Sequence, residues 1–256
     1  MSRILLQVAY DGTSFSGYAL QGDKRTVERC LNEALTQFTD TEVTVIGASR
    51  TDAGVHAYGN LAVFDTASPV PAERFARILD RFLPADLRVV RSCEVPADFH
   101  PRHTGAVKTY EYRIRNTAVP DPIADRYSYR YSYPLDPAQM REAAAYLVGE
   151  HDFTSFCNPE TQSPTRVREI TGCSLDMRIS EKGDMRDPEL ILHISGKGFL
   201  YHQVRIITGT LLEVGRGLKK PGDIPQILAA RDRRLAGFTA PPQGLFLIGY
   251  DLQGMI

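Results

Sequence analysis

In the first hundred positions, apolar residues recur with the two-residue period of a strand in some segments and with the roughly 3.6-residue period of a helix in others. This alternation restricts the fold more than any other feature of the chain. Four segments have the pattern of strands, and two longer ones repeat apolar residues at helical spacing. The expected elements are strand 3–10, helix 26–38, strands 43–48 and 60–66, helix 71–83 and strand 87–95. Their order, βαββαβ, predicts a split-βαβ or ferredoxin-like arrangement.

A second series of elements begins near residue 105. It contains strands at 108–116 and 126–133, a helix at 136–149 with Asp136 as a candidate N-cap, strands at 169–179 and 189–196, a helix at 200–215 and a strand at 245–252. The chain is therefore expected to be α+β, with two halves that each have a sheet of their own. We place these halves at residues 1–104 and 105–256.

The overall charge does not point to a protein that binds nucleic acid. The net charge is −1 and the pI is about 6.6, whereas nucleic-acid-binding domains often have a pI above about 9. However, 24 of the 30 basic residues are arginine, which binds phosphate in a bidentate manner better than lysine does. A GC-rich genome would produce the same bias.

Cysteine spacing and hydropathy bear on the cellular compartment. The four cysteines form no C-x-x-C pair, which argues against a zinc site and fits reduced thiols in a cytoplasm. The N-terminus lacks the apolar core of a signal peptide, and no apolar run approaches the roughly 18 residues of a membrane span. We expect a cytoplasmic protein that does not enter a membrane.

The stretch G-A-S-R-T-D-A-G-V-H-A at 47–57 places an arginine, a carboxylate and a histidine beside a predicted strand. An isolated T-D-A-G is most simply a turn in which Gly54 adopts a positive φ. Because this turn leaves a central strand, its side chains would also project past the sheet edge into a cleft. Arg50 and Asp52 are therefore candidate site residues.

The helix expected at 200–215 is apolar nearly all round, which predicts that it is buried. Arg205 lies within it and needs a partner there. A structural ion pair with any nearby carboxylate would serve, and so would extension of the side chain to the surface. The more specific hypothesis is an ion pair with Asp52 across the two halves.

Tyrosines and arginines alternate in K-T-Y-E-Y-R-I-R at 108–115 and R-Y-S-Y-R-Y-S-Y at 126–133. Aromatic rings on strands can stack on bases, and arginines can hold phosphates. Tyrosine is also simply a good strand residue, which would explain at least half of the pattern.

Several blocks together resemble the TruA family of tRNA pseudouridine synthases. R-T-D-A-G-V-H-A at 50–57 reproduces the signature of that family. Further blocks follow in the family's order and extend the resemblance over almost the whole chain: F-H-P-R at 99–102, K-T-Y-E-Y-R-I at 108–114, D-F-T-S-F at 152–156, F-L-Y-H-Q-V-R at 199–205 and G-L-F-L at 244–247. The resemblance implies the pseudouridine synthase fold, in which two ferredoxin-like or RRM-like halves join their antiparallel sheets around a central cleft.

The resemblance also implies a role for each candidate residue. Members of the family use a single catalytic aspartate, which matches Asp52. Arg205 matches the arginine that pairs with that aspartate, and Tyr110 matches the tyrosine that stacks on the uracil. Leu245 matches an apolar residue of the same pocket, and Arg50 matches a residue that helps to displace the target base from its stack.

The implied reaction breaks the C1′–N1 bond of uridine, turns the base over and rejoins it to the ribose through C5. Nothing is oxidised and nothing leaves, so neither a cofactor nor a metal is expected. Carboxylates do comparable work at other glycosidic carbons. The implied substrate is tRNA, at positions 38–40 of the anticodon stem-loop, and the implied assembly is a homodimer.

Six positions depart from the family pattern, but none of them is Asp52, Tyr110 or Arg205. They concern the choice of target uridine and the contacts with RNA more than the chemistry. The departures are Ser49 in place of Gly, Tyr18 and Ala19 in place of Trp and Gln, Pro101 and His103 in place of Ala and an aromatic residue, and Gln203 in place of Met.

Two other functions compete with this hypothesis. A non-catalytic RNA-binding module would also have βαββαβ halves with stacking aromatics, although the K/R-G-F/Y-G/A-F-V-x-F/Y run of such modules is absent. A metal-free glycosidase or nucleosidase would use the same carboxylate chemistry. Such enzymes typically need two carboxyl groups, and the motif has no second acid near Asp52.

Overall fold

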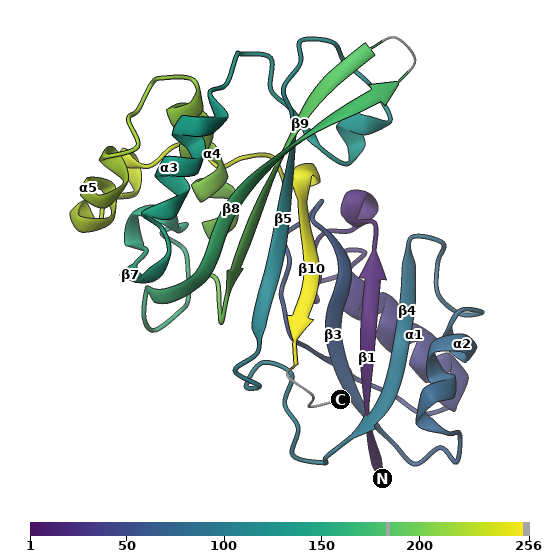
Figure 1. The fold of residues 1–256 in the computed structure, drawn as a ribbon. Helices are drawn as coiled ribbons and strands as arrows, with labels where there is room; N and C mark the ends of the chain where they lie inside the picture. The colour runs from purple at the N-terminus through teal and green to yellow at the C-terminus, as the bar shows by residue number, and fades with distance from the viewer. Residues whose placement is uncertain (183–184, 253–256) are drawn as a thin grey trace. The chain divides into compact units, whose positions relative to one another are not determined.

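The computed structural model describes residues 1–182 and 185–252, and it confirms a mixed α+β fold (Figure 1). Two compact units make up the chain. The first contains Met1–Ala106 and the C-terminal segment from Phe246 onward, and the second contains Val107–Leu245. None of the helices within the described ranges is both long enough and apolar enough to cross a membrane.

The first unit combines a mainly antiparallel sheet with two helices. Its elements are β1 (Ser2–Tyr10), α1 (Val27–Thr39), β2 (Ile46–Gly47), β3 (His56–Thr66), α2 (Phe75–Leu79), β4 (Leu87–Val95) and β10 (Leu245–Asp251). β1 lies between β4 and β3, and β2 pairs with β3. This is the strand order of the split-βαβ plan, so that prediction is confirmed for this unit.

β10 joins the first unit from the far end of the chain. Phe246 and Leu247 pair in parallel with His56 and Ala57 at the start of β3. A boundary near residue 105 assigns this strand to the second half, whereas the residues from Phe246 onward belong to the first compact unit. Apolar spacing indicates that a strand is present but does not specify its neighbour.

α1 begins and packs as its sequence indicates. Thr26 caps it by accepting a hydrogen bond from the backbone N–H of Arg29 at 3.3 Å. Val27, Leu31 and Leu35 are fully buried on one side of the helix, and each such side chain contributes about 1.5–3 kcal/mol. In the view of Figure 1 the helix lies behind the sheet of its own unit.

The strand predicted over 43–48 is reduced to the two residues of β2. Side chains of α1 take the backbone donors that a longer strand would use. Thr36 Oγ1 accepts from the N–H of Val43 at 3.1 Å, and Asn32 Oδ1 accepts from the N–H of Val45 at 2.9 Å. The helix predicted over 71–83 is also shorter, because a 3-10 turn precedes α2 and further turns follow it.

The second unit has a sheet in the order β5–β9–β8–β7 in which neighbouring strands are antiparallel, and β6 pairs in parallel with β5. Its elements are β5 (Val107–Arg115), β6 (Tyr129–Arg130), α3 (Pro137–Ala145), β7 (Gly149–Asp152), β8 (Val167–Lys182), β9 (Met185–Gly196), α4 (Gln203–Gly215) and α5 (Asp223–Ala230). α3 packs on β8, where Arg141 Nε donates to the carbonyl of Leu175 at 2.9 Å.

The strand predicted over 126–133 is wrong except for β6. The segment is entered through a 3-10 turn, because the Asp121 carboxylate accepts from the N–H groups of Ile123 and Ala124, both at 2.9 Å. Tyr127 then donates its N–H to the carbonyl of Ala124 at 3.0 Å. The alternating tyrosines resemble a strand, but a local turn uses the backbone donors first.

The helices of the second unit differ from the prediction mainly at their ends. Asp136 caps α3 as predicted, accepting from the N–H of Ala138 at 2.9 Å, but α3 ends at Ala145 and β7 follows. α4 begins only at Gln203, because His202 has the left-handed φ of 62°. α5 is not predicted from the sequence at all.

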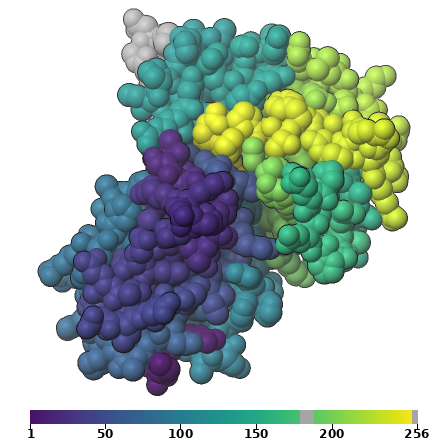
Figure 2. Space-filling model, turned by 180° about the vertical axis from the view of Figure 1, so that it is seen from behind, coloured from purple at the N-terminus to yellow at the C-terminus, as the bar shows by residue number. Residues whose placement is uncertain are grey.

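α4 is buried on nearly every side, as predicted. The segment 236–240 packs against one side of α4, where the N–H of Gly237 donates to Thr210 Oγ1 at 2.8 Å. Gly209 allows this approach, since a Cβ there would lie 1.9 Å from the carbonyl oxygen of Phe238. Seen from behind, the last part of the second unit forms a yellow band on the surface of that unit (Figure 2).

Candidate active site

The motif predicted as functional forms the loop between β2 and β3. The N–H of Val55 donates to the carbonyl of Asp52 at 3.2 Å, and Gly54 has a φ of +79°. The expected turn is therefore confirmed, and Gly suits it because left-handed backbone costs Gly no steric strain. Within the loop Arg50 is exposed and Asp52 has intermediate exposure.

Thr51, between Arg50 and Asp52, anchors the loop to the first strand. Its hydroxyl is 2.8 Å from the hydroxyl of Tyr10, and its carbonyl accepts the N–H of Tyr18 at 3.0 Å. Gly17 adopts a φ of +93° beside this contact, and a Cβ there would lie 2.9 Å from the carbonyl oxygen of Thr51. The loop is thus held by backbone and buried hydroxyl contacts on the side that precedes Asp52.

Asn60 of β3 holds the start of the loop at Ser49. Its Oδ1 accepts the N–H of Ser49 at 3.1 Å, and its Nδ2 donates to the carbonyl of Ser49 at 2.9 Å and to the Tyr10 hydroxyl at 3.1 Å. Tyr250 donates to Ser49 Oγ at 2.6 Å. The serine that departs from the family pattern is therefore part of a buried hydrogen-bond network.

His56, the histidine of the motif, starts β3 and is 2% exposed. Its Nδ1 accepts the N–H of Gly12 at 3.1 Å and lies 3.3 Å from Asp11 Oδ1. The ring also stacks on Phe246 at 4.6 Å, so this histidine joins the Asp11–Gly12 turn to β10.

Tyr110 lies on β5, opposite Ile194 of β9, and is 8% exposed. Its ring meets the ring of Phe199 edge-on, with centroids 5.2 Å apart and an interplanar angle of 87°. This contact orients the tyrosine on its strand, as edge-to-face pairs do.

Arg205 lies in the first turns of α4, where its Nε donates to the carbonyl of Ala240 at 2.7 Å. The backbone of the same two residues is joined as well, since the N–H of Ala240 donates to the carbonyl of Arg205 at 3.0 Å. The predicted need for a partner inside this helix is thus met in part by a carbonyl. The arginine is tied to the segment that leads toward Leu245.

Leu245 is 5% exposed and follows a short 3-10 turn over Pro242–Gly244. Tyr112 of β5 holds this turn by donating its hydroxyl to the carbonyl of Pro241 at 2.7 Å. Burial raises the pKa of Tyr112, and the positive charge of Arg205 opposes that rise. Tyr112 therefore links the surroundings of Arg205 and Leu245 within the second unit.

The profile of the tRNA pseudouridine synthase family matches residues 6–103 and 143–251. The chain belongs to this family. A relative from Halalkalibacterium halodurans, named tRNA pseudouridine synthase A, is 44% identical over 96% of this chain and 90% of its own length. A relative of the same name from Brevibacillus brevis is 44% identical over 96% of this chain and 97% of its own.

Among solved structures, a chain of an archaeal box H/ACA sRNP Nop10–Cbf5 complex matches with 14% sequence identity and a TM-score of 0.27. The match covers 82% of this chain and 54% of that one.

The candidate residues of this tRNA pseudouridine synthase are divided between the two units. Arg50 and Asp52 share the motif loop of the first unit, whereas Tyr110, Arg205 and Leu245 belong to the second. In the described part of the chain, no three His, Cys, Asp or Glu side chains gather in a way that could hold a metal ion.

Sequence reasoning missed the residues that support the motif loop of this family member. Tyr10, Asn60 and Tyr250 are far apart in the sequence and meet only through the register of β1, β3 and β10. The Asp11–Gly12 turn carries the one local signal, since Asp-Gly directly after a strand is typical of a turn.

We expect Asn60→Ala to destabilise the loop and lower turnover. The change removes the side chain that bonds to both the N–H and the carbonyl of Ser49 in a buried place, which costs about 1–3 kcal/mol for each of these groups. Chemical denaturation and pseudouridine formation per folded molecule measure the two effects. Asn32→Ala, which removes a single bond to Val45, is the matched control and should affect neither as strongly. An Asn60→Ala protein that unfolds like its parent would contradict the network.

Proposed function

We propose that this chain isomerises uridine to pseudouridine in tRNA, with Asp52 as the catalytic carboxylate. Membership of the tRNA pseudouridine synthase family supports the proposal most strongly, because relatives named tRNA pseudouridine synthase A align over 96% of the chain. The geometry adds that Asp52 lies on a loop held at Ser49, Thr51 and Val55.

The reaction needs a carboxylate near the sugar. The C1′–N1 bond breaks, the base turns, and a C1′–C5 bond forms, while C5 loses a proton and N1 gains one. The product is an isomer of the substrate. An ionised carboxylate serves the reaction either by attacking C1′ or by removing a proton from the ribose, and carboxylates are established in such roles.

The other candidate residues complete the proposal. Arg205 would pair with the Asp52 carboxylate through the guanidinium nitrogens other than Nε, which already bonds to Ala240. Tyr110 would stack on the uracil, and Leu245 would line the same pocket. Arg50, exposed on the motif loop, would occupy the place of the displaced base and so reduce the cost of unstacking it.

The finer points of the proposal follow from the resemblance to the TruA family. The target uridines would lie at positions 38–40 of the anticodon stem-loop, and the working assembly would be a homodimer in the cytoplasm. Paired basic clefts on an otherwise acidic surface would reconcile RNA binding with a net charge of −1. Analytical ultracentrifugation tests the dimer, and a monomer at working concentration would contradict it.

The direct test is to treat unmodified tRNA with the protein and map pseudouridine by carbodiimide-dependent stops of reverse transcription. We expect stops in the anticodon stem-loop and no change in RNA mass. Release of free uracil would instead identify a glycosidase or nucleosidase. Binding without any stop would identify a non-catalytic RNA-binding module.

Tyr110→Phe should slow turnover while keeping much of the stacking, and Tyr110→Ala should lose more. A ring stacked on a base contributes about 1–3 kcal/mol, and the hydroxyl supplies a possible proton donor or acceptor at the detached base. Single-turnover rates and melting temperatures of both variants measure this, with Tyr146→Ala, an exposed tyrosine, as the control. A purely thermal defect would mean that Tyr110 only packs against Phe199.

A further inference from the structure

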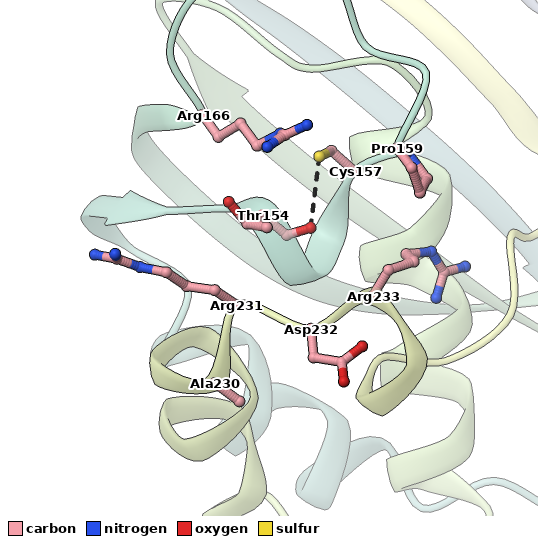
Figure 3. Close-up of a pocket in the computed structure, with 8 residues that line it drawn as sticks. All are labelled: Thr154, Cys157, Pro159, Arg166, Ala230, Arg231, Asp232 and Arg233. Carbon is pink, nitrogen blue, oxygen red and sulfur yellow. Dashed lines mark hydrogen bonds between the residues drawn. The ribbon is translucent and has the colours of Figure 1, made fainter.

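The second unit contains a cavity of about 490 Å³ between the turn that follows β7 and the segment that follows α5 (Figure 3). Arg166, Arg231 and Arg233 all line it, together with Cys157 and Asp232. Three arginines around one cavity concentrate positive charge in a chain whose net charge is only −1. We call this cavity the arginine pocket.

Two carboxylates near the arginine pocket, those of Asp152 and Asp232, form ion pairs with Arg231 and Arg234. Asp152 lies 3.0 Å from Arg231 Nε, and the Arg231 side chain points away from the cavity in Figure 3. Asp232 lies 2.7 Å from the exposed Arg234. Arg166 and Arg233 form no ion pair with a carboxylate among the described residues, although Asp152 lies near enough to interact with the charge of Arg166 and Glu213 with that of Arg233.

Arg166 makes few contacts for a partly buried cation. Its guanidinium lies beside the thiol of Cys157 (Figure 3), and its buried Nε has no hydrogen-bond partner among the described residues. Burial raises the pKa of Cys157, although the positive charges of Arg166 and Arg233 oppose the rise. The thiol therefore stays neutral and does not compensate the charge of either arginine. A donor left unpaired in this way costs free energy unless a ligand accepts from it.

Arg233 also lines the pocket, but in Figure 3 its guanidinium points away from the Cys157 thiol. It donates to the carbonyl of Gly237 at 2.8 Å and lies 3.3 Å from Thr239 Oγ1. Burial lowers the pKa of this guanidinium, and the nearby Glu213 opposes the effect only partly. Glu213 itself lies 3.4 Å from Lys219. Arg166 would thus gain a hydrogen-bond acceptor from an anion in the cavity, and Arg233 adds a second positive charge to the lining.

We propose that the arginine pocket holds a phosphate group of the tRNA backbone. This inference rests on the proposed function, because the tRNA substrate is the polyanion that the function supplies. A phosphate has several acceptor oxygens, and the planar guanidinium fork donates to such oxygens in pairs. The pocket opens on a unit other than the one that carries the motif loop, so it provides a contact with RNA in addition to those at the target base.

Titration of unmodified tRNA over a series of salt concentrations tests the proposal with Arg166→Gln. Each phosphate contact contributes about 0.7–1 to the slope of log affinity against log salt, so the variant should lose that much of the slope. Its affinity at fixed salt should fall about tenfold, as expected for one charge-assisted bond. Arg178→Gln removes the same charge from an exposed site on β8 and should change neither quantity.

Two further measurements identify what the pocket binds. Arg166→Lys keeps the charge but not the fork, so it should recover most of the slope and only part of the affinity. Inorganic phosphate should raise the melting temperature of the parent more than chloride does at equal ionic strength, and this gain should be lost in Arg166→Gln.

Several results would overturn the inference. One is an unchanged slope of log affinity against log salt in Arg166→Gln, and another is a slope that Arg166→Lys does not recover. A third is stabilisation by inorganic phosphate while Arg166→Gln leaves tRNA binding unchanged, which would mean a site for free anions only. Because binding is measured directly, a parent that binds tRNA without forming pseudouridine would refute the proposed function and leave the phosphate site standing.

Discussion

Replacing Asp52 by asparagine is expected to abolish pseudouridine formation while tRNA affinity stays within about tenfold of the parent, or about 1.4 kcal/mol. Asparagine keeps the shape of the side chain and loses only the ionised oxygen. The backbone contacts of the loop, from Val55 to Asp52 and from Ser49 to Asn60, do not depend on the carboxylate. The loss should therefore fall on the chemical step and not on binding.

The measurement is a single-turnover assay with the enzyme in saturating excess over tRNA, followed by a binding titration with the same samples. Asp40→Asn is a suitable control, because Asp40 is exposed and ends α1 with a left-handed φ of 53°, which asparagine tolerates. This control should behave like the parent in both assays. Full activity in Asp52→Asn would remove the residue from the catalytic role.

Arg205→Met is expected to lower both stability and turnover. If the guanidinium pairs with the Asp52 carboxylate, its removal leaves a charge without compensation, which costs about 3–5 kcal/mol for a buried pair. The bond from Arg205 Nε to the carbonyl of Ala240 is lost as well, at about 1.5–3 kcal/mol for a charged donor.

A double-mutant cycle separates these two contributions. Denaturation of Arg205→Met, Asp52→Asn and the double variant should show a coupling energy, since the pair can be lost only once. Equal destabilisation by Arg205→Met in both backgrounds would assign the whole cost to the contact with Ala240. A variant that melts and reacts like the parent would contradict any structural role for the arginine.

Much of the fold could be predicted because its signals are local. The apolar spacing of α1 and the Asp136 cap of α3 act within a few residues, so they are readable in any window of the chain. β1, β4 and β5 also appear close to their predicted bounds. The strand predicted over 126–133 shows where this fails, because the side chain of Asp121, outside the window, accepts from the backbone at the start of a 3-10 turn over Ala124–Arg126 that leads into the segment.

The candidate site was predictable for a different reason. Asp52 and Arg50 belong to one short motif, and Arg205 stands out as a charge within an apolar helix. The support of the motif could not be predicted in the same way. Tyr10, Asn60 and Tyr250 come from three separate strands, and only the register between β1, β3 and β10 brings their side chains to Ser49 and Thr51.

The sequence by itself determined the family, the α+β class, most helices and strands, and the residues expected to act on the uridine. Tertiary structure decided which strand β10 joins, how the motif loop is held, and that Arg166 and Arg233 line one cavity with Cys157. The physical reason is the range of the forces involved. Apolar periodicity and capping depend on neighbours along the chain, whereas buried hydrogen bonds and uncompensated charges depend on which distant residues packing brings together.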